Sequence, residues 1–245
     1  MNLGIYQGIS NADYHGDKGV SKSQLDKLAR SPAHYHHSTK AEQEPTEAMK
    51  IGTATHTAIL EPELFDAEIA IAPQADRRTK AGKAEWAEFC AAAEGKTIIK
   101  PEDHHAIACM RDAVMSHPAA SELLTGGIAE QSAYWIDEET GLMCRCRPDY
   151  HRGSFLADLK TTDDASPRAF ARSVAKFRYH VQAAYYMDGF NTAGGAIDEF
   201  VFVAVEKSPP YAVAVYYLDD DGVQRGPVGR ASGRGRVESD GGRVG

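Results

Sequence analysis

The spacing of apolar residues changes its period near residue 130, and this change constrains the fold more than any other feature of the chain. Before it, the helical period of about 3.6 residues predicts helices over 21–29, 48–59, 81–93 and 101–116. After it, apolar and polar residues alternate; the expected strands are 131–136, 142–150, 154–160, 199–205 and 211–218. One long helix is expected between the third and fourth strands, over 166–190. Helices combined with such strands indicate an α/β or α+β layered domain.

The chain is acidic, with 27 Lys or Arg residues against 35 Asp or Glu residues and a formal net charge of −8. This balance excludes a protein that coats nucleic acid by bulk charge, although it allows an enzyme whose carboxylates hold a metal. No apolar run approaches the roughly 18 residues of a membrane span, so no association with a membrane is expected. Met1-Asn2-Leu3-Gly4 has no basic region followed by an apolar core, so no secretory signal is expected, and the four cysteines include no C-x-x-C pair; a cytoplasmic protein is therefore expected.

The composition changes again after Asp221. Residues 222–245 contain eight of the 22 glycines and five arginines, but no aromatic residue, Leu or Ile. Such a segment buries too little apolar surface to fold, so we expect one domain over 1–221 and a disordered tail over 222–245. The tail is either inert or touches single-stranded nucleic acid, and its composition raises the hypothesis of a shifted reading frame or a truncation.

Two neighbouring strands carry the residues that indicate chemistry. Arg147-Pro148-Asp149 ends one of them, and Asp158-Leu159-Lys160 lies on the next. Because side chains alternate along a strand, Asp158 and Lys160 share a face, with Leu159 in the opposite layer. If Arg152-Gly153 is a two-residue hairpin loop, His151 pairs with Ser154 and Arg147 lies opposite Asp158. Asp149 is then a diagonal neighbour of Asp158 on the same face, at roughly 7 Å between α-carbons.

This arrangement suits the hydrolysis of phosphodiesters. Two carboxylates can bind Mg²⁺ through oxygen, and the metal polarises the scissile phosphate and acidifies a water molecule. Lys160 can orient that water or stabilise the negative charge that builds in the transition state. The alternative is a solvated ladder of Asp and Lys residues, which any antiparallel sheet can carry.

Further motifs accompany these strands in a fixed order. They are Tyr14-His15 with Ser21-Lys22-Ser23, Gly52-x-x-x-His56, Glu130-Gln131-Ser132, Cys146-Arg147-Pro148-Asp149, Asp158-Leu159-Lys160-Thr161-Thr162 and Gln182-x-x-x-Tyr186. Together they resemble the PD-(D/E)XK nuclease superfamily, and more closely its phage-type exodeoxyribonuclease VIII group, the RecE exonuclease domain. The resemblance covers about residues 3–218 and implies a central mixed sheet flanked by helices. The Gly/Arg-rich tail departs from the ordered helical segment expected in this group.

The resemblance implies a catalytic role for four of the matching residues. Asp149 and Asp158 would be metal ligands, and Lys160 would be the catalytic lysine. His56 would be a further metal ligand or would act next to the metal; otherwise it is a core histidine on a helix of small residues.

Four more residues are implied at the substrate. Glu130 would reach the metal indirectly, unless it is a solvated strand end. Gln182 and Tyr186 share a helical face that would contact the DNA backbone, although Tyr186 can equally be a core aromatic residue. Arg147 would bind phosphate.

The implied activity is a Mg²⁺-dependent exonuclease, with Mn²⁺ as a substitute, that digests double-stranded DNA from 5′ ends. The remaining 3′ strand would pass to a single-strand annealing protein in phage or prophage recombination, and the enzyme would form a homo-oligomeric ring. One alternative is a PD-(D/E)XK nuclease of different polarity or substrate, such as a Cas4-like enzyme. Its iron–sulfur cysteines would follow the nuclease motifs, whereas all four cysteines here precede Asp149. The other alternative is a catalytically silent DNA-binding or assembly module.

Overall fold

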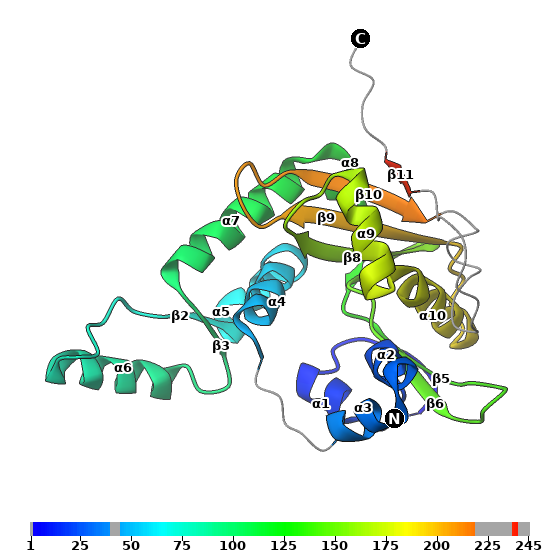
Figure 1. The fold of residues 1–245 in the computed structure, drawn as a ribbon, viewed down its shortest axis with the longest axis horizontal. Coiled ribbons are helices and arrows are strands. Elements are labelled where there is room, and N and C mark those ends of the chain that lie inside the picture. The colour runs from blue at the N-terminus through cyan, green and yellow to red at the C-terminus, as the bar shows by residue number, and fades with distance from the viewer. Residues whose placement is uncertain (1, 40–44, 219–236, 240–245) are drawn as a thin grey trace, which may run out of the picture.

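The computed structural model of the chain describes residues 2–39, 45–218 and 237–239 (Figure 1). Its strands are β1 (Gly4–Tyr6), β2 (Ile69–Ile71), β3 (Thr97–Ile99), β4 (Ile128–Ala129), β5 (Ser132–Ile136), β6 (Met143–Cys146), β7 (Tyr150–Arg152), β8 (Phe155–Thr162), β9 (Glu199–Glu206), β10 (Val213–Leu218) and β11 (Val237–Ser239). Its helices are α1 (Asn11–Gly16), α2 (Lys22–Arg30), α3 (Pro32–Ser38), α4 (Glu47–Leu60), α5 (Phe65–Glu68), α6 (Lys80–Ala92), α7 (Pro101–Ser116), α8 (Pro118–Leu123), α9 (Pro167–Phe177) and α10 (Tyr179–Thr192), with a 3-10 turn at Pro62–Leu64.

Local signals set the ends of the helices in the first half of the chain. The main-chain N–H of Ser21 donates to Gln24 Oε1 at 2.8 Å, which fixes the start of α2. Ser31 and Pro32 separate α2 from α3, because a proline cannot continue the preceding helix. α7 begins at Pro101, a position where the missing N–H would have no helical partner.

A six-stranded sheet forms the centre of the molecule, in the order β11-β10-β9-β8-β7-β4. β8 and β9 pair in parallel along their whole length, from Phe155 opposite Glu199 to Thr162 opposite Glu206. The remaining pairs are antiparallel. α9 and α10 make the connection from β8 to β9, as a parallel pair requires. The predicted layered class with a mixed sheet flanked by helices is confirmed.

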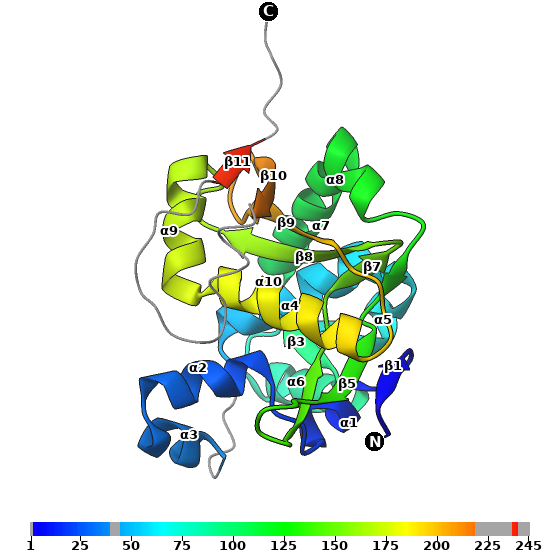
Figure 2. The same ribbon diagram turned by 90° about the vertical axis from the view of Figure 1, so that its right-hand side faces the viewer.

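Helices cover both faces of this sheet, and each face has its own core (Figure 2). On one face α4, α7 and α8 bury alternate strand residues, among them Leu159 and Val203. On the other face α9 and α10 bury the intervening residues, among them Leu156 and Phe202. β8 therefore contributes to both cores, and the residues that follow along it alternate between them.

A second sheet, in the order β1-β5-β6, packs against α10. The single strand predicted over 142–150 is therefore wrong, since β6 belongs to this second sheet and β7 to the central one. Between them lie Arg147, Pro148 and Asp149. Pro148 has no N–H to donate to a ladder, which explains why the strand is interrupted here. Asp149 consequently lies at the junction of the two sheets.

The helix predicted over 166–190 is also divided, into α9 and α10. Arg178 between them adopts a left-handed conformation with φ 55°. Its guanidinium donates from Nη1 to Asp26 Oδ1 of α2 at 3.0 Å, a tertiary contact that the local sequence does not signal. The break turns α10 away from the direction of α9 (Figure 1).

Most of the predicted tail lies outside the described residues. Within it, Val237–Ser239 form β11, antiparallel to β10, so these three residues depart from the predicted disorder. An unpaired β10 would be an edge strand with free hydrogen-bonding groups, and β11 pairs with that edge. The division of the chain at residue 221 remains a prediction. No helix in the described part of the chain has the length and apolar character needed to cross a bilayer.

Candidate active site

The turn between β7 and β8 sets the register of the two strands that carry the carboxylates. Tyr150 pairs with Ala157 and Arg152 with Phe155, so Gly153 and Ser154 form the turn. The predicted turn at Arg152-Gly153, with Arg147 opposite Asp158, is wrong. Gly153 has φ +58°, and a hairpin turn that needs positive φ at its first central residue accounts for the glycine there. The register differs by two residues, an even number, so each residue of β7 keeps the face that the predicted pairing gave it, whereas Asp149 lies just outside the paired residues.

Asp149 lies where β7 has not yet begun, beside the central strand β8. Its Oδ2 accepts a hydrogen bond of 2.7 Å from the main-chain N–H of Leu159. The carboxylate thus takes the place of a strand partner for β8. Burial alone would raise the pKa of Asp149, but the adjacent His56 and Lys160 together with the Leu159 N–H hold it below its ordinary value.

Asp158, Lys160 and Gln182 form a buried triad on the α10 face of the sheet. Lys160 Nζ lies 2.5 Å from Asp158 Oδ2 and donates to Gln182 Oε1 at 3.2 Å. Gln182 Nε2 in turn donates to Asp158 Oδ1. Leu159 points into the opposite core, so the prediction that Asp158 and Lys160 share one face is confirmed. Gln182 reaches the triad because the break at Arg178 sets the direction of α10.

The pKa values of both ionisable groups in this triad are raised. Asp158 is 1% exposed, and its burial together with the charge of Asp149 raises its pKa to about 6. Burial would lower the pKa of Lys160, but the carboxylates of Asp158 and Asp149 outweigh this effect and raise it. Lys160 is therefore an ammonium group at neutral pH and can stabilise charge, but it is poorly suited to accept a proton.

His56 projects from α4 toward Asp149. Its Nδ1 lies 2.8 Å from the Gly52 carbonyl oxygen, and its Nε2 lies 2.9 Å from Asp149 Oδ2. Burial would lower the pKa of His56, but Asp149 and the Gly52 carbonyl raise it to about 9. A Cβ added at Gly52 would meet nothing within 4 Å, so this glycine leaves open space one turn before His56.

Glu130 lies at the kink between β4 and β5 and joins the same cluster. Its main-chain N–H donates to the Asp149 carbonyl at 3.1 Å, and its Oε2 is 4.0 Å from Arg147 Nε. Its φ of 51° is a left-handed conformation, which costs about 1–3 kcal/mol for a residue other than glycine. Burial and the charge of Asp149 raise its pKa to about 8. The partly exposed Glu130 side chain thus holds a proton more readily than an ordinary glutamate.

Arg147 is 8% exposed and holds the N-terminal segment against β5. Its guanidinium donates to the Ile9 carbonyl at 2.9 Å, to Asn11 Oδ1 at 3.0 Å and to Ser132 Oγ at 2.8 Å. With these donors engaged within the protein, a role in phosphate binding remains a prediction.

Tyr186 packs in the second core, edge-on to Phe200 with 6.2 Å between ring centroids. This is the position of a core aromatic residue, and its contact with DNA remains a prediction. Tyr179 was not predicted at the site, although Lys160 Nζ lies 4.6 Å from the centre of its ring. The position of Tyr179 over Lys160 depends on the break at Arg178, which the unbroken helix expected over 166–190 did not include.

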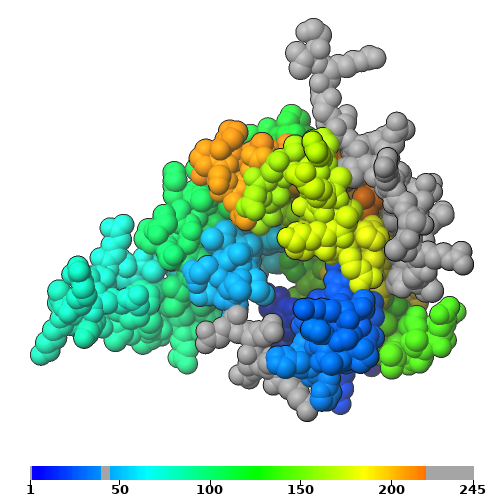
Figure 3. Space-filling view, in the orientation of Figure 1, coloured from blue at the N-terminus to red at the C-terminus, as the bar shows by residue number. Residues whose placement is uncertain are grey.

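The elements that carry these residues surround a depression. Figure 3 shows the surface hollowed between α4, the N-terminal helices and α10. A family described as "PDDEXK-like domain of unknown function (DUF3799)" matches residues 21–227. The chain belongs to this family. The prediction of the PD-(D/E)XK superfamily is thereby confirmed, and the closer resemblance to the RecE exonuclease domain remains a prediction.

The fold of this PDDEXK-like domain is also found in a solved structure from Eubacterium rectale, that of a candidate exonuclease. The two chains are 12% identical and superpose with a TM-score of 0.61, over 89% of this chain and 81% of the other. At this identity the likeness concerns the fold. No curated protein matches the chain in sequence.

PDDEXK-like domains generally use divalent metal ions, and the donors of this domain suit one chemically. Asp158 Oδ2 is buried without a directed hydrogen bond, despite its contact with Lys160, and Asp149 supplies a second carboxylate. Among the described residues no three His, Cys, Asp or Glu side chains converge as a metal cage. Mg²⁺ commonly takes only one or two carboxylates and completes its shell with water and substrate phosphate. The residues therefore fit a cation held by Asp149 and Asp158, with His56 beside it.

Proposed function

We propose that this PDDEXK-like domain is a Mg²⁺-dependent exodeoxyribonuclease that hydrolyses linear duplex DNA from 5′ to 3′. The observation that carries the proposal is the junction at which Asp149 meets the Asp158-Leu159-Lys160 strand, with the ammonium of Lys160 held between Asp158 and Gln182. The fold shared with a candidate exonuclease and the order of the sequence motifs support it.

The residues of the site would have separate roles in the hydrolysis of the phosphodiester. A cation bound to Asp149 and Asp158 would polarise the scissile phosphate and acidify a water molecule. Lys160 is fixed as a cation and stabilises the negative charge that grows on the phosphate oxygens. The bond from water oxygen to phosphorus forms as the water loses a proton to bulk solvent, the P–O bond to the next nucleotide breaks, and the departing oxygen takes up a proton from solvent. Gln182 holds Asp158 and Lys160 in register for this step.

The biological setting belongs to the same proposal. We infer that the enzyme acts on phage or prophage DNA in the cytoplasm, as a ring-shaped homo-oligomer that passes its 3′ strand to a single-strand annealing protein. The sequence resemblance to the exodeoxyribonuclease VIII group supports this setting. Light scattering of the purified protein tests the oligomer: a monomer mass at micromolar concentration would contradict the ring.

Labelled linear duplex tests the activity and its polarity. With Mg²⁺ we expect loss of a 5′ label as mononucleotides, no attack on closed circular duplex, and no reaction in excess chelator. Asp158→Ala and Lys160→Ala should each reduce the rate by at least about 100-fold. Lys83→Ala, an exposed lysine on α6, is the matched control and should cleave as the wild type does.

The other outcomes identify the alternatives. Loss of the 3′ label first, or attack on single strands alone, would favour a PD-(D/E)XK nuclease of different polarity, such as a Cas4-like enzyme. Intact DNA with the wild type in both Mg²⁺ and Mn²⁺, together with retained binding to DNA, would leave a catalytically silent binding module.

A further inference from the structure

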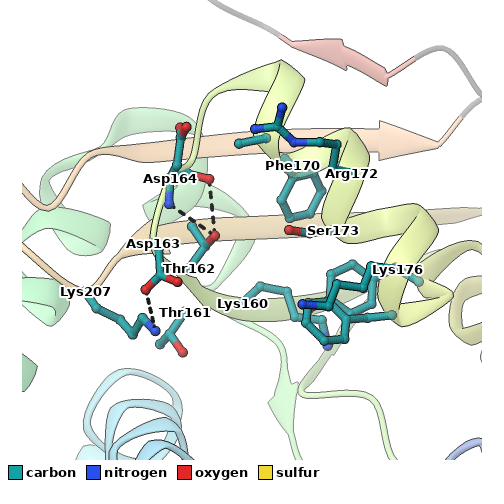
Figure 4. Close-up of a pocket in the computed structure, with 13 residues that line it drawn as sticks. Lys160, Thr161, Thr162, Asp163, Asp164, Phe170, Arg172, Ser173, Lys176 and Lys207 are labelled. Carbon is teal, nitrogen blue, oxygen red and sulfur yellow. Dashed lines mark hydrogen bonds and ion pairs between the residues drawn. The ribbon is translucent and has the colours of Figure 1, made fainter.

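A pocket of about 430 Å³ opens at the end of β8, directly beyond Lys160. β8 and the loop after it form one wall, and α9 forms the other (Figure 4). Lys160 and Lys176 lie at one end, and the ion pair of Asp163 with Lys207, 2.7 Å long, lies at the other. This volume falls in the range of sites for small ligands and is too small for a DNA duplex.

The outer face of α9 carries unneutralised positive charge along this pocket. Arg168, Arg172 and Lys176 are spaced four residues apart, so they form one stripe on the helix. All three are exposed, α9 contains no acidic residue, and within the described chain none of the three forms an ion pair. The charge of Arg172 nevertheless acts on Asp164, and Lys176 Nζ lies 5.0 Å from the centre of the Phe177 ring, so a base that stacks there displaces it. A cationic stripe retained in a protein of net charge −8 indicates an anionic ligand at this face.

A stack of aromatic rings leads from the core to the mouth of the pocket. Phe202 is fully buried; Tyr179 stacks on it at 5.4 Å between centroids, and Phe177 stacks on Tyr179 at 5.7 Å. Phe177, at the outer end, is 48% exposed. Lys160 Nζ lies over the middle ring, that of Tyr179, so the stack runs beside the catalytic lysine.

We propose that this pocket binds one single-stranded nucleotide next to the scissile phosphate, with its base stacked on Phe177 and its phosphate bound by Arg172 and Lys176. Bases in a duplex are stacked on each other, whereas an unpaired base offers a free face to an aromatic side chain. The assignment rests on the proposed nuclease function only for the position of the scissile phosphate. It adds a binding subsite for the separated strand that adjoins the Asp149–Asp158–Lys160 centre and shares Lys160 with it.

Binding in chelator tests the base contact without any cleavage. Fluorescence anisotropy compares an eight-nucleotide oligothymidylate with the same oligomer in which every base is replaced by an abasic analogue. We expect Phe177→Ala to weaken oligothymidylate binding about 5- to 150-fold and to leave abasic binding unchanged, because only the base stacks. Phe177→Trp should restore the affinity. Leu142→Ala, an equally exposed apolar residue on the β5–β6 hairpin, controls for a general surface effect.

The salt dependence of binding tests the phosphate contacts. Arg172→Ala and Lys176→Ala should each lower the slope of log K against log salt by about 0.7, with Lys83→Ala unchanged. Three results would each overturn the subsite. They are an equal loss of affinity for both oligomers in Phe177→Ala, binding that is unchanged in all three variants, and a wild type that binds neither oligomer. If the wild type cleaves duplex DNA and one of these results is found, the proposed nuclease function is supported and the subsite is rejected. If binding depends on the base but no DNA is cleaved, the nuclease function is rejected and the subsite is supported.

Discussion

Asp158→Asn should stabilise the metal-free protein at neutral pH, although it removes a charged residue of the site. Burial and the charge of Asp149 raise the pKa of Asp158 from its ordinary 3.8 to about 6. Between these values the folded protein binds more protons than the unfolded chain, so its free energy of unfolding falls as the pH rises. A difference of about 2 pH units corresponds to about 3 kcal/mol, all of it lost above pH 6.

Urea unfolding in chelator at pH 7.5 and pH 4 measures this effect. At pH 7.5 the free energy of unfolding of the variant should exceed that of the wild type by about 3 kcal/mol. For a chain of this size, this difference raises the urea midpoint by roughly 1 M. At pH 4 the two should nearly coincide, because Asp158 is then protonated in the folded wild type. Added Mg²⁺ should narrow the gap at pH 7.5, since a cation offsets the repulsion between the carboxylates.

Asp163→Asn is the matched control for this experiment. Asp163→Asn removes a carboxylate whose side chain is 91% exposed and which is also paired with a lysine, so it should change stability by less than about 0.5 kcal/mol at either pH. An Asp158→Asn variant no more stable than the wild type at pH 7.5 would refute the reasoning. The contact with Lys160 would then outweigh the cost of burying the carboxylate beside Asp149.

Two further measurements concern packing and pH. Gly189→Ala would place a Cβ 2.4 Å from the Trp135 ring and should lower the free energy of unfolding by about 1–3 kcal/mol. Gly52→Ala, whose Cβ meets nothing within 4 Å, should raise the free energy of unfolding by up to about 1 kcal/mol. Equal effects of the two substitutions on urea unfolding would contradict the packing described. The pKa of His56 is raised to about 9 by Asp149, so its contribution is complete below pH 6.5 and is lost as the pH rises through about 9. This group should lower wild-type stability in chelator by up to about 3 kcal/mol over that window, in addition to the fall up to about pH 8 that the raised pKa of Glu130 contributes, and a His56→Gln variant should show the smaller decline.

Features governed by local period could be predicted from the sequence. The alternation along β8 placed Asp158 and Lys160 together, and the helical spacing placed His56 and Gln182 on helices; that both helices face β8 is a finding of the structure. These assignments depend on geometry repeated every two to four residues, which neighbouring residues determine.

Features set by long-range contacts could not be predicted in this way. The break at Arg178 depends on Asp26, which lies on a helix far away in the sequence. Without that break, neither the hydrogen bonds of Gln182 nor the position of Tyr179 follows from the sequence. The hairpin register is different, since the need for glycine at the first turn position is a local rule, and applying it to Gly153 gives the observed pairing.

The location of the site between two separate cores has a consequence for how activity arises during folding. His56 comes from a helix of one core and Gln182 from a helix of the other, and β8 is the strand they share. A chain in which only one core has formed therefore lacks either His56 or Gln182 at the candidate site. For a nuclease such a dependence on two cores is protective, because a nascent or partly denatured chain would carry no assembled cutting centre until both cores had formed.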